Sequence, residues 1–203
     1  HTRPNLSYCI GVLSRYMANP KDSHGVALKQ CLRYLRGTAT LGLCFERSRS
    51  ETIRLIGYSD SSYNTDPDDG RSVTGHIFYL GRSPITWCSQ KQDTVALSSC
   101  EAEFMAATEA ARQAIWLQDL LGEITGAVCN KTVIRIDNRS AIALSKNPVF
   151  HGRSKHIHSR YHFIRECVER ELLEVEHVPG SEQKADILTK ALGRIKYREM
   201  RDL

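Results

Sequence analysis

The order of hydrophobic periodicities along the chain constrains its fold more than any other feature. From residue 52 onward, helical spacing gives way to short segments rich in β-branched and aromatic residues. Turn residues at Asp68-Asp69-Gly70 and at Gly81-Arg82 separate these segments. The pattern therefore predicts three consecutive antiparallel strands, at Thr52–Ser59, Ser72–Leu80 and Ser83–Ser89.

A long helix is predicted to follow the third strand. Ser98 or Ser99 can cap its start, and Glu101 is placed to close a capping box on Ser98. Apolar residues at helical spacing mark its buried side: Phe104, Ala107, Ala111, Ile115 and Leu121.

The rest of the chain alternates between strand and helix patterns. The predicted elements are a strand at Val133–Ile136, a helix around Ser140–Ser145, a helix at His156–Glu171, a strand at Leu172–Val178 and a helix opening near Glu182 or Gln183. This βββ-α-β-α-α-β-α order predicts an α/β fold (α+β, mixed sheet) with helices packed against the faces of the sheet.

Two helices are predicted before the first strand. Leu6, Ile10, Leu13 and Met17 repeat at helical spacing, Pro20 ends that run, and a second helix ends at Gly37. The second helix has an apolar face and a basic face, the latter formed by Lys29, Arg33 and Arg36. The basic face fits either phosphate contacts or the solvated side of a packed helical hairpin. The polar run 46–51 is the predicted boundary with the sheet region.

Composition limits the class of protein. The chain has 203 residues and is 41% hydrophobic, enough for one substantial core plus a small unit. Its net charge of +5 suits a polyanionic partner and equally a solvated basic surface.

Seven cysteines without a CxxC pair favour a reducing compartment. Without a signal peptide or an apolar run near the roughly 20 residues that span a bilayer, an intracellular protein with no membrane partner is expected. The first residues, which lack an initiator Met, indicate a fragment.

Four carboxylates lie at predicted strand ends or helix starts, which are positions typical of functional sites. Asp60 ends the first predicted strand and Asp137 ends the fourth, so their side chains meet if the two strands are neighbours. Glu103 lies in the first turn of the long helix, and Asp186 lies near the start of the last one. Any one of these acids alone is more typical of a turn or a helix cap, and only the set of four indicates a site.

A cluster of four carboxylates predicts a divalent cation, because the acids repel one another unless they are neutralised. Oxygen-only ligands favour Mg²⁺ or Mn²⁺ over zinc. Two such ions can activate water on one side of a phosphodiester and stabilise the leaving oxygen on the other. The cluster therefore predicts cleavage of a nucleic-acid backbone without a nucleophilic side chain.

Several motifs in one order resemble the ribonuclease H domain of copia-type retrotransposon Pol polyproteins, over nearly the whole chain. They are the stretches 57–60 (GYSD), 71–75 (RSVTG), 95–103 (VALSSCEAE), 136–141 (IDNRSA), 155–157 (KHI), 160–166 (RYHFIRE) and 185–190 (ADILTK). The helical pair, with the stretches 3–5 (RPN), 13–17 (LSRYM) and 32–38 (LRYLRGT), resembles the end of the preceding reverse transcriptase.

The resemblance implies a ribonuclease H-like fold: a five-stranded mixed sheet flanked by helices, with an N-terminal helical hairpin. It implies a reverse transcriptase end at 1–45, a ribonuclease H domain at 51–193 and a C-terminal tail at 194–203. It further implies hydrolysis of the RNA strand of an RNA/DNA hybrid, with Asp60, Glu103, Asp137 and Asp186 holding two Mg²⁺ ions, for which Mn²⁺ can substitute. Its expected partners are the hybrid and the remainder of the Pol polyprotein. Its expected location is the cytoplasm, or a virus-like particle where the parent element is active.

Further residues are predicted to contact the nucleic acid: Ser62, Ser99, Asn138, Lys155, His156 and Arg160. The histidines at 151, 156, 158 and 162 also fit a zinc site, but the basic residues between them favour a strip that meets phosphates. Trp87, Trp116 and Tyr161 are expected in the core.

One departure from the family pattern and two alternative functions leave the function open at this stage. Many ribonucleases H carry a mobile histidine shortly before the last aspartate, where this chain has the short loop 179–181; His177, on the preceding strand, is expected to be structural. Two alternatives to an active enzyme remain: a catalytically silent nucleic-acid-binding relic, and a structural part of a larger reverse transcriptase.

Overall fold

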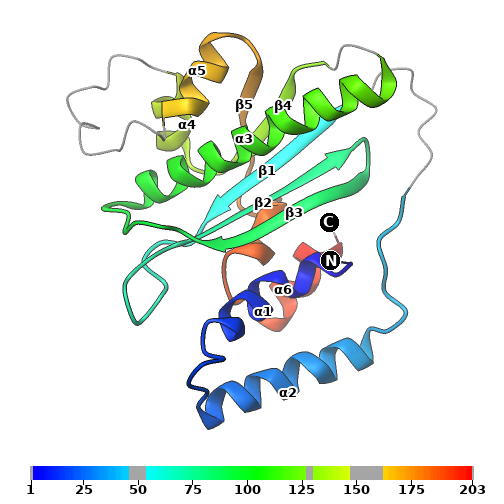
Figure 1. The fold of residues 1–203 in the computed structure, drawn as a ribbon, viewed down its shortest axis with the longest axis vertical. Helices are drawn as coiled ribbons and strands as arrows, with labels where there is room; N and C mark the ends of the chain where they lie inside the picture. Colours follow the sequence, from blue (N-terminus) through cyan, green and yellow to red (C-terminus); the bar gives the residue numbers. More distant parts are fainter. Residues whose placement is uncertain (1, 46–53, 127–129, 147–161, 203) are drawn as a thin grey trace.

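The chain folds around one mixed sheet with helices on both faces (Figure 1). The computed structural model describes residues 2–45, 54–126, 130–146 and 162–202. The sheet contains β1 (Leu55–Ser61), β2 (Val73–Leu80), β3 (Ser83–Lys91), β4 (Thr132–Ile136) and β5 (Leu173–His177), in the order β3-β2-β1-β4-β5. β1, β2 and β3 pair antiparallel, while β4 pairs parallel with both β1 and β5. The five-stranded mixed sheet predicted from the sequence is confirmed.

One face of the sheet is covered by α3 (Ser99–Thr125), α4 (Arg139–Lys146) and α5 (Phe163–Glu169). Alanines at 102, 107, 110, 111 and 114 of α3 are buried, which brings the helix backbone close to the strands. Phe104 of α3 and Phe78 of β2 are fully buried in this layer. Burial of their rings removes a large apolar area from water and fixes α3 on the sheet.

The opposite face packs against the 3₁₀ helix η4 (Lys184–Leu188) and α6 (Arg194–Asp202). Tyr58 and Ile77 of the sheet lie in one buried cluster with Leu188 of η4 and Met200 of α6. The predicted last helix is thus a 3₁₀ turn, and the residues expected to form a tail fold into α6. Met200 and the partly buried Tyr197 give α6 an apolar side that faces the core.

The N-terminal segment forms η1 (Pro4–Leu6), α1 (Ser7–Ser14) and α2 (Asp22–Gly37). The second predicted helix ends at Gly37 as expected, but the first ends at Ser14, before Met17. Arg15 pairs with Asp66 at 3.0 Å, which anchors α1 beside the loop between β1 and β2. Neither α1 nor α2 has a buried residue, and Leu32 on the apolar side of α2 is 57% exposed.

Among the described residues, the structure contains no helix that combines the length and the apolar character needed to cross a bilayer. Part of the predicted helix 156–171 lies outside the described residues, and its remainder forms α5. Trp87 is partly buried against the cluster that the sheet forms with η4 and α6. Trp116, which was also expected in the core, is 56% exposed on α3.

Candidate active site

Two aspartates meet at one edge of the sheet because β1 and β4 are parallel neighbours. Tyr58 is paired with Arg135, so two residues further along each strand Asp60 and Asp137 stand at the same level. Asp60 lies within β1 and is 1% exposed, while Asp137 directly follows β4 and is half-buried. The condition on which the sequence analysis made the meeting of Asp60 and Asp137 depend, that these two strands are neighbours, is met.

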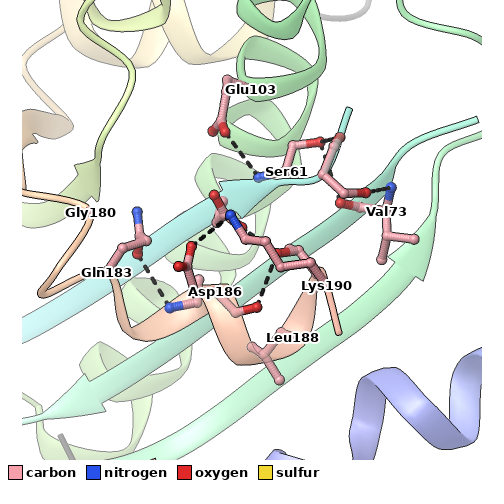
Figure 2. A network of polar contacts seen from close by, with 12 residues as sticks. Ser61, Val73, Glu103, Gly180, Gln183, Asp186, Leu188 and Lys190 are labelled. Atoms are coloured by element: carbon pink, nitrogen blue, oxygen red, sulfur yellow. Dashed lines mark hydrogen bonds and ion pairs between the residues drawn. The ribbon is translucent and has the colours of Figure 1, made fainter. Parts of the chain in front are cut away.

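Asp186 joins them from η4, on the other side of the sheet. One carboxylate oxygen from each of Asp60, Asp137 and Asp186 lies within 4.8 Å of the others. Gln183 fixes the start of η4: its amide donates to the Ser59 carbonyl of β1 at 2.9 Å, and its oxygen accepts from the Ala185 N–H (Figure 2). Gln183 is fully buried, so this hydrogen bond to β1 holds Asp186 at the sheet edge.

Glu103 reaches the same place from the first turns of α3. Its Oε1 accepts the Ser61 N–H at 3.2 Å (Figure 2). Ser98 caps α3 by accepting the Glu101 N–H, while the Glu101 carboxylate accepts the Leu97 N–H at 2.8 Å. Glu101 is thus used at the helix start, and Glu103 is the acid that faces Asp60 and Asp137.

The crowding of these acids changes their titration. Burial, followed by the charges of Asp60 and Asp137, raises the pKa of Glu103 to about 10. Burial also raises the pKa of Asp137 and of Asp186, with a nearby aspartate adding to the shift in each case. Ionisation of Glu103, Asp137 and Asp186 is therefore unfavourable in the folded chain unless a cation compensates the negative charge.

The donor set fits a hard divalent cation. It consists of carboxylate oxygens, which Mg²⁺ and Mn²⁺ prefer. Among the described residues, Asp60 Oδ1 and Glu103 Oε2 are buried and accept no hydrogen bond. A buried carboxylate oxygen without a partner is costly, and both of these oxygens fit coordination of a cation.

Basic side chains stand close to the acids. Lys190 Nζ lies 2.9 Å from Asp186 Oδ1 and 3.4 Å from Asp60 Oδ2. His177, for which a structural role was expected, is exposed at the end of β5, and its charge acts to lower the pKa of Asp137. Lys196 of α6 acts on Asp186 in the same sense.

We expect the chain without divalent metal to lose stability as the pH rises. Burial raises the pKa of Glu103 in the folded chain from its ordinary value of 4.5 to about 10, so between these values the folded state keeps a proton that the unfolded chain releases. The free energy of unfolding then falls as pH rises through this window. Melting in a chelator at pH 5 and pH 8 measures the effect, and Glu103→Gln should show a weaker pH dependence. Equal pH dependence in both proteins would contradict the shifted pKa.

The residues predicted to contact nucleic acid fall into two groups. Ser99 is exposed at the start of α3, Asn138 accepts the Ala141 N–H at the start of α4, and Ser62 is buried with its hydroxyl accepting the Val73 N–H at 2.8 Å. Ser62 and Asn138 thus also have structural hydrogen bonds. The other three, Lys155, His156 and Arg160, lie outside the described residues, as do His151 and His158 of the alternative zinc site.

Sequence reasoning gave no role to three residues that the structure brings to the site. Gln183 anchors η4, the Thr189 hydroxyl donates to Asp60 Oδ2, and Lys190 pairs with two of the acids. The stretch 185–190 was noted for its resemblance to a family motif. Within it, the spacing of Asp186 and Lys190, four residues apart, is typical of an ion pair on a helical turn.

No family model matches the chain, but comparison with known proteins finds relatives that match it over nearly its whole length. The chain is 44% identical over 202 residues to the retrovirus-related Pol polyprotein from transposon TNT 1-94 of Nicotiana tabacum, covering 100% of the chain and 15% of the polyprotein. It is 44% identical over 197 residues to that of transposon RE2 of Arabidopsis thaliana, covering 97% of the chain and 13% of the polyprotein.

Among solved structures, the chain is similar to LC11-RNase H1 isolated from compost, with a TM-score of 0.49 and 18% identity, covering 68% of this chain and 94% of that one. Over its whole length, the chain therefore matches a segment of the retrovirus-related Pol polyproteins of plant transposons.

Proposed function

We propose that this domain hydrolyses the RNA strand of RNA/DNA hybrids by endonucleolytic cleavage, as part of reverse transcription by a transposon Pol polyprotein. The observation that carries the proposal is the convergence of three aspartates, Asp60, Asp137 and Asp186, whose oxygens lie within 4.8 Å of one another. Glu103 is not part of that group of three but is close enough for the charges of Asp60 and Asp137 to act on it. Burial and neighbouring aspartates raise the pKa of Glu103 and of Asp186, so placing these carboxylates together is unfavourable for the fold. A site that is unfavourable for the fold is typical of function.

In this proposal the four acids hold two Mg²⁺ ions, with Mn²⁺ as a substitute. The ions would supply an activated water and charge stabilisation for the leaving oxygen. Asp60 and Glu103 each offer a buried oxygen that accepts no hydrogen bond from the described residues. The partners already made, from Thr189 to Asp60 and from Ser61 to Glu103, restrict how these two carboxylates can rotate. Such restraint favours one coordination geometry over others.

The remaining side chains around the site serve the substrate. The backbone phosphates of a hybrid are negatively charged, and Lys196 and the exposed His177 stand beside the acids. Selection of the RNA strand requires contact with its 2′-hydroxyl groups. Ser99, exposed in the first turn of α3, and Asn138, which follows Asp137, are proposed for these contacts.

A cleavage assay tests the proposal. The chain is incubated with Mg²⁺ and an RNA/DNA hybrid labelled on either strand, and with RNA duplex, DNA duplex and single-stranded RNA of the same sequence. We expect internal cuts in the RNA strand of the hybrid only, and none when a chelator is present. Tight binding of the hybrid without cleavage in Mg²⁺ or Mn²⁺ would instead support a silent nucleic-acid-binding relic.

The setting of the reaction is also a proposal. The matched polyproteins are far longer than this chain, so we propose that the domain works beside the reverse transcriptase of the same polyprotein. The exposed apolar side of α2, with Leu28, Leu32 and Leu35, fits contact with such a neighbour. We further propose that the reaction takes place in the cytoplasm, within virus-like particles where the parent element is active.

A further inference from the structure

Lys190 already supplies a positive charge to the candidate site. Its Nζ lies 2.9 Å from Asp186 Oδ1 and 3.4 Å from Asp60 Oδ2. Figure 2 shows the side chain folded back from the end of η4 toward Asp186. One ammonium group thus bridges two acids that are far apart in the sequence, Asp60 in β1 and Asp186 in η4.

This arrangement differs from an ordinary surface ion pair. Asp60 is 1% exposed, and the Lys190 side chain is itself about two-thirds covered, at 37% exposure. The charge of Lys190 also acts on the other two acids, favouring the ionised forms of Asp137 and Glu103. Lys190 therefore compensates all four carboxylates, whereas an exposed pair contributes little.

The ammonium group and a divalent cation would compete for the same oxygens. Mg²⁺ binds carboxylate oxygens at about 2.0–2.1 Å, and the three aspartate oxygens lie within 4.8 Å of one another. An ammonium group has three donors and no acceptor, so it cannot become a ligand of the ion. A cation held between Asp60 and Asp186 would therefore meet Lys190 in the same space, with two positive charges repelling each other.

We propose that Lys190 is a resident counter-ion, which holds the carboxylates together before metal binds and must leave them when a divalent cation enters. The inference rests on the proposed function only in assuming that divalent cations bind at this cluster. Lys190 is a positioning residue in this scheme, because it acts through Asp60 and Asp186. It sets the cation concentration at which the site fills.

Metal binding without nucleic acid tests the inference. Mn²⁺ is titrated into the wild-type chain and into Lys190→Met, and binding is followed by calorimetry and by the rise in melting temperature. We expect Lys190→Met to melt lower than the wild type in a chelator and to bind Mn²⁺ about tenfold more tightly, since the competing charge is gone. The matched control is Lys131→Met, at the opposite end of β4, which should bind Mn²⁺ like the wild type. Equal or weaker binding by Lys190→Met would overturn the inference.

A second measurement uses only the wild-type chain, so it does not depend on whether a variant folds. In the wild-type chain, the rate at which a lysine-acylating reagent modifies Lys190 is followed by mass spectrometry, with Lys131 as internal reference. Added Mn²⁺ should speed modification of Lys190 several-fold relative to Lys131, and an unchanged ratio would overturn the inference. If both measurements behave as expected but no hybrid is cleaved, the proposed function fails and the role of Lys190 stands.

Discussion

Asp60→Asn is expected to lower the rate of RNA cleavage in a hybrid by about a thousandfold or more, which corresponds to roughly 4 kcal/mol of activation free energy. Asp60 is the most buried of the four acids, and its Oδ1 has no partner among the described residues. Asparagine has the same shape and still offers an oxygen to Thr189, so the fold is retained. The neutral amide, however, is a poor ligand for a divalent cation.

Stability separates this loss of activity from unfolding. Asp60→Asn removes one of several crowded negative charges, so its melting temperature in a chelator should equal or exceed that of the wild type. Metal should raise its melting temperature less than that of the wild type. Asp119→Asn, an exposed position in the second half of α3, removes the same charge away from the site and should cleave normally. Full cleavage by Asp60→Asn would refute the assignment of the site.

Gly75→Val is expected to damage both stability and cleavage. Gly75 of β2 is paired with Asp60 of β1, and the segment carrying Asp186 crosses directly over it. A Cβ atom there would lie 2.6 Å from Thr189 Cγ2 and 2.8 Å from Leu188 Cβ, closer than packed atoms come. The segment must therefore move away from the sheet, at a cost of about 1–3 kcal/mol.

Cleavage should fall further than stability alone explains. Asp186, Thr189 and Lys190 belong to the displaced segment, so their contacts with Asp60 are disturbed even in molecules that remain folded. Chemical denaturation and hybrid cleavage at a temperature where the variant is folded measure the two effects. Gly42→Val is the matched control, because a Cβ at that exposed position meets nothing within 4 Å. Wild-type stability and cleavage in Gly75→Val would mean that the segment is not held against β2.

The parts of the fold that depend on local pattern were predictable. Strand alternation and turn residues located β2 to within one residue, and Ser98, one of the two predicted N-cap residues, caps α3. The sequence placed an aspartate at the end of each of two apolar strands, but the pairing of β1 with β4 was only a condition, which the structure meets. Strand alternation, turn residues and helix caps each involve only a few consecutive residues, so a short stretch of sequence is enough to recognise them.

The parts that depend on distant contacts were not predictable. No local pattern shows that Lys190 folds back onto Asp60, 130 positions earlier, or that Trp116 stays exposed on a helix with a buried alanine side. The residues after 194 read as a polar tail because only Met200 and Tyr197 of α6 reach the core. These features are decided by packing against segments that are remote in sequence.

The contact between α6 and the N-terminal segment brings the two ends of the chain together. Tyr197 donates a hydrogen bond to the Asn5 carbonyl at 2.7 Å, and residues 2–5 share a pocket with residues 200–202. The N and C marks lie close together in Figure 1. A short linker could therefore join residues 2 and 202. A circularly permuted chain with its new termini at the turn Gly81-Arg82 would keep the same strand order in the sheet.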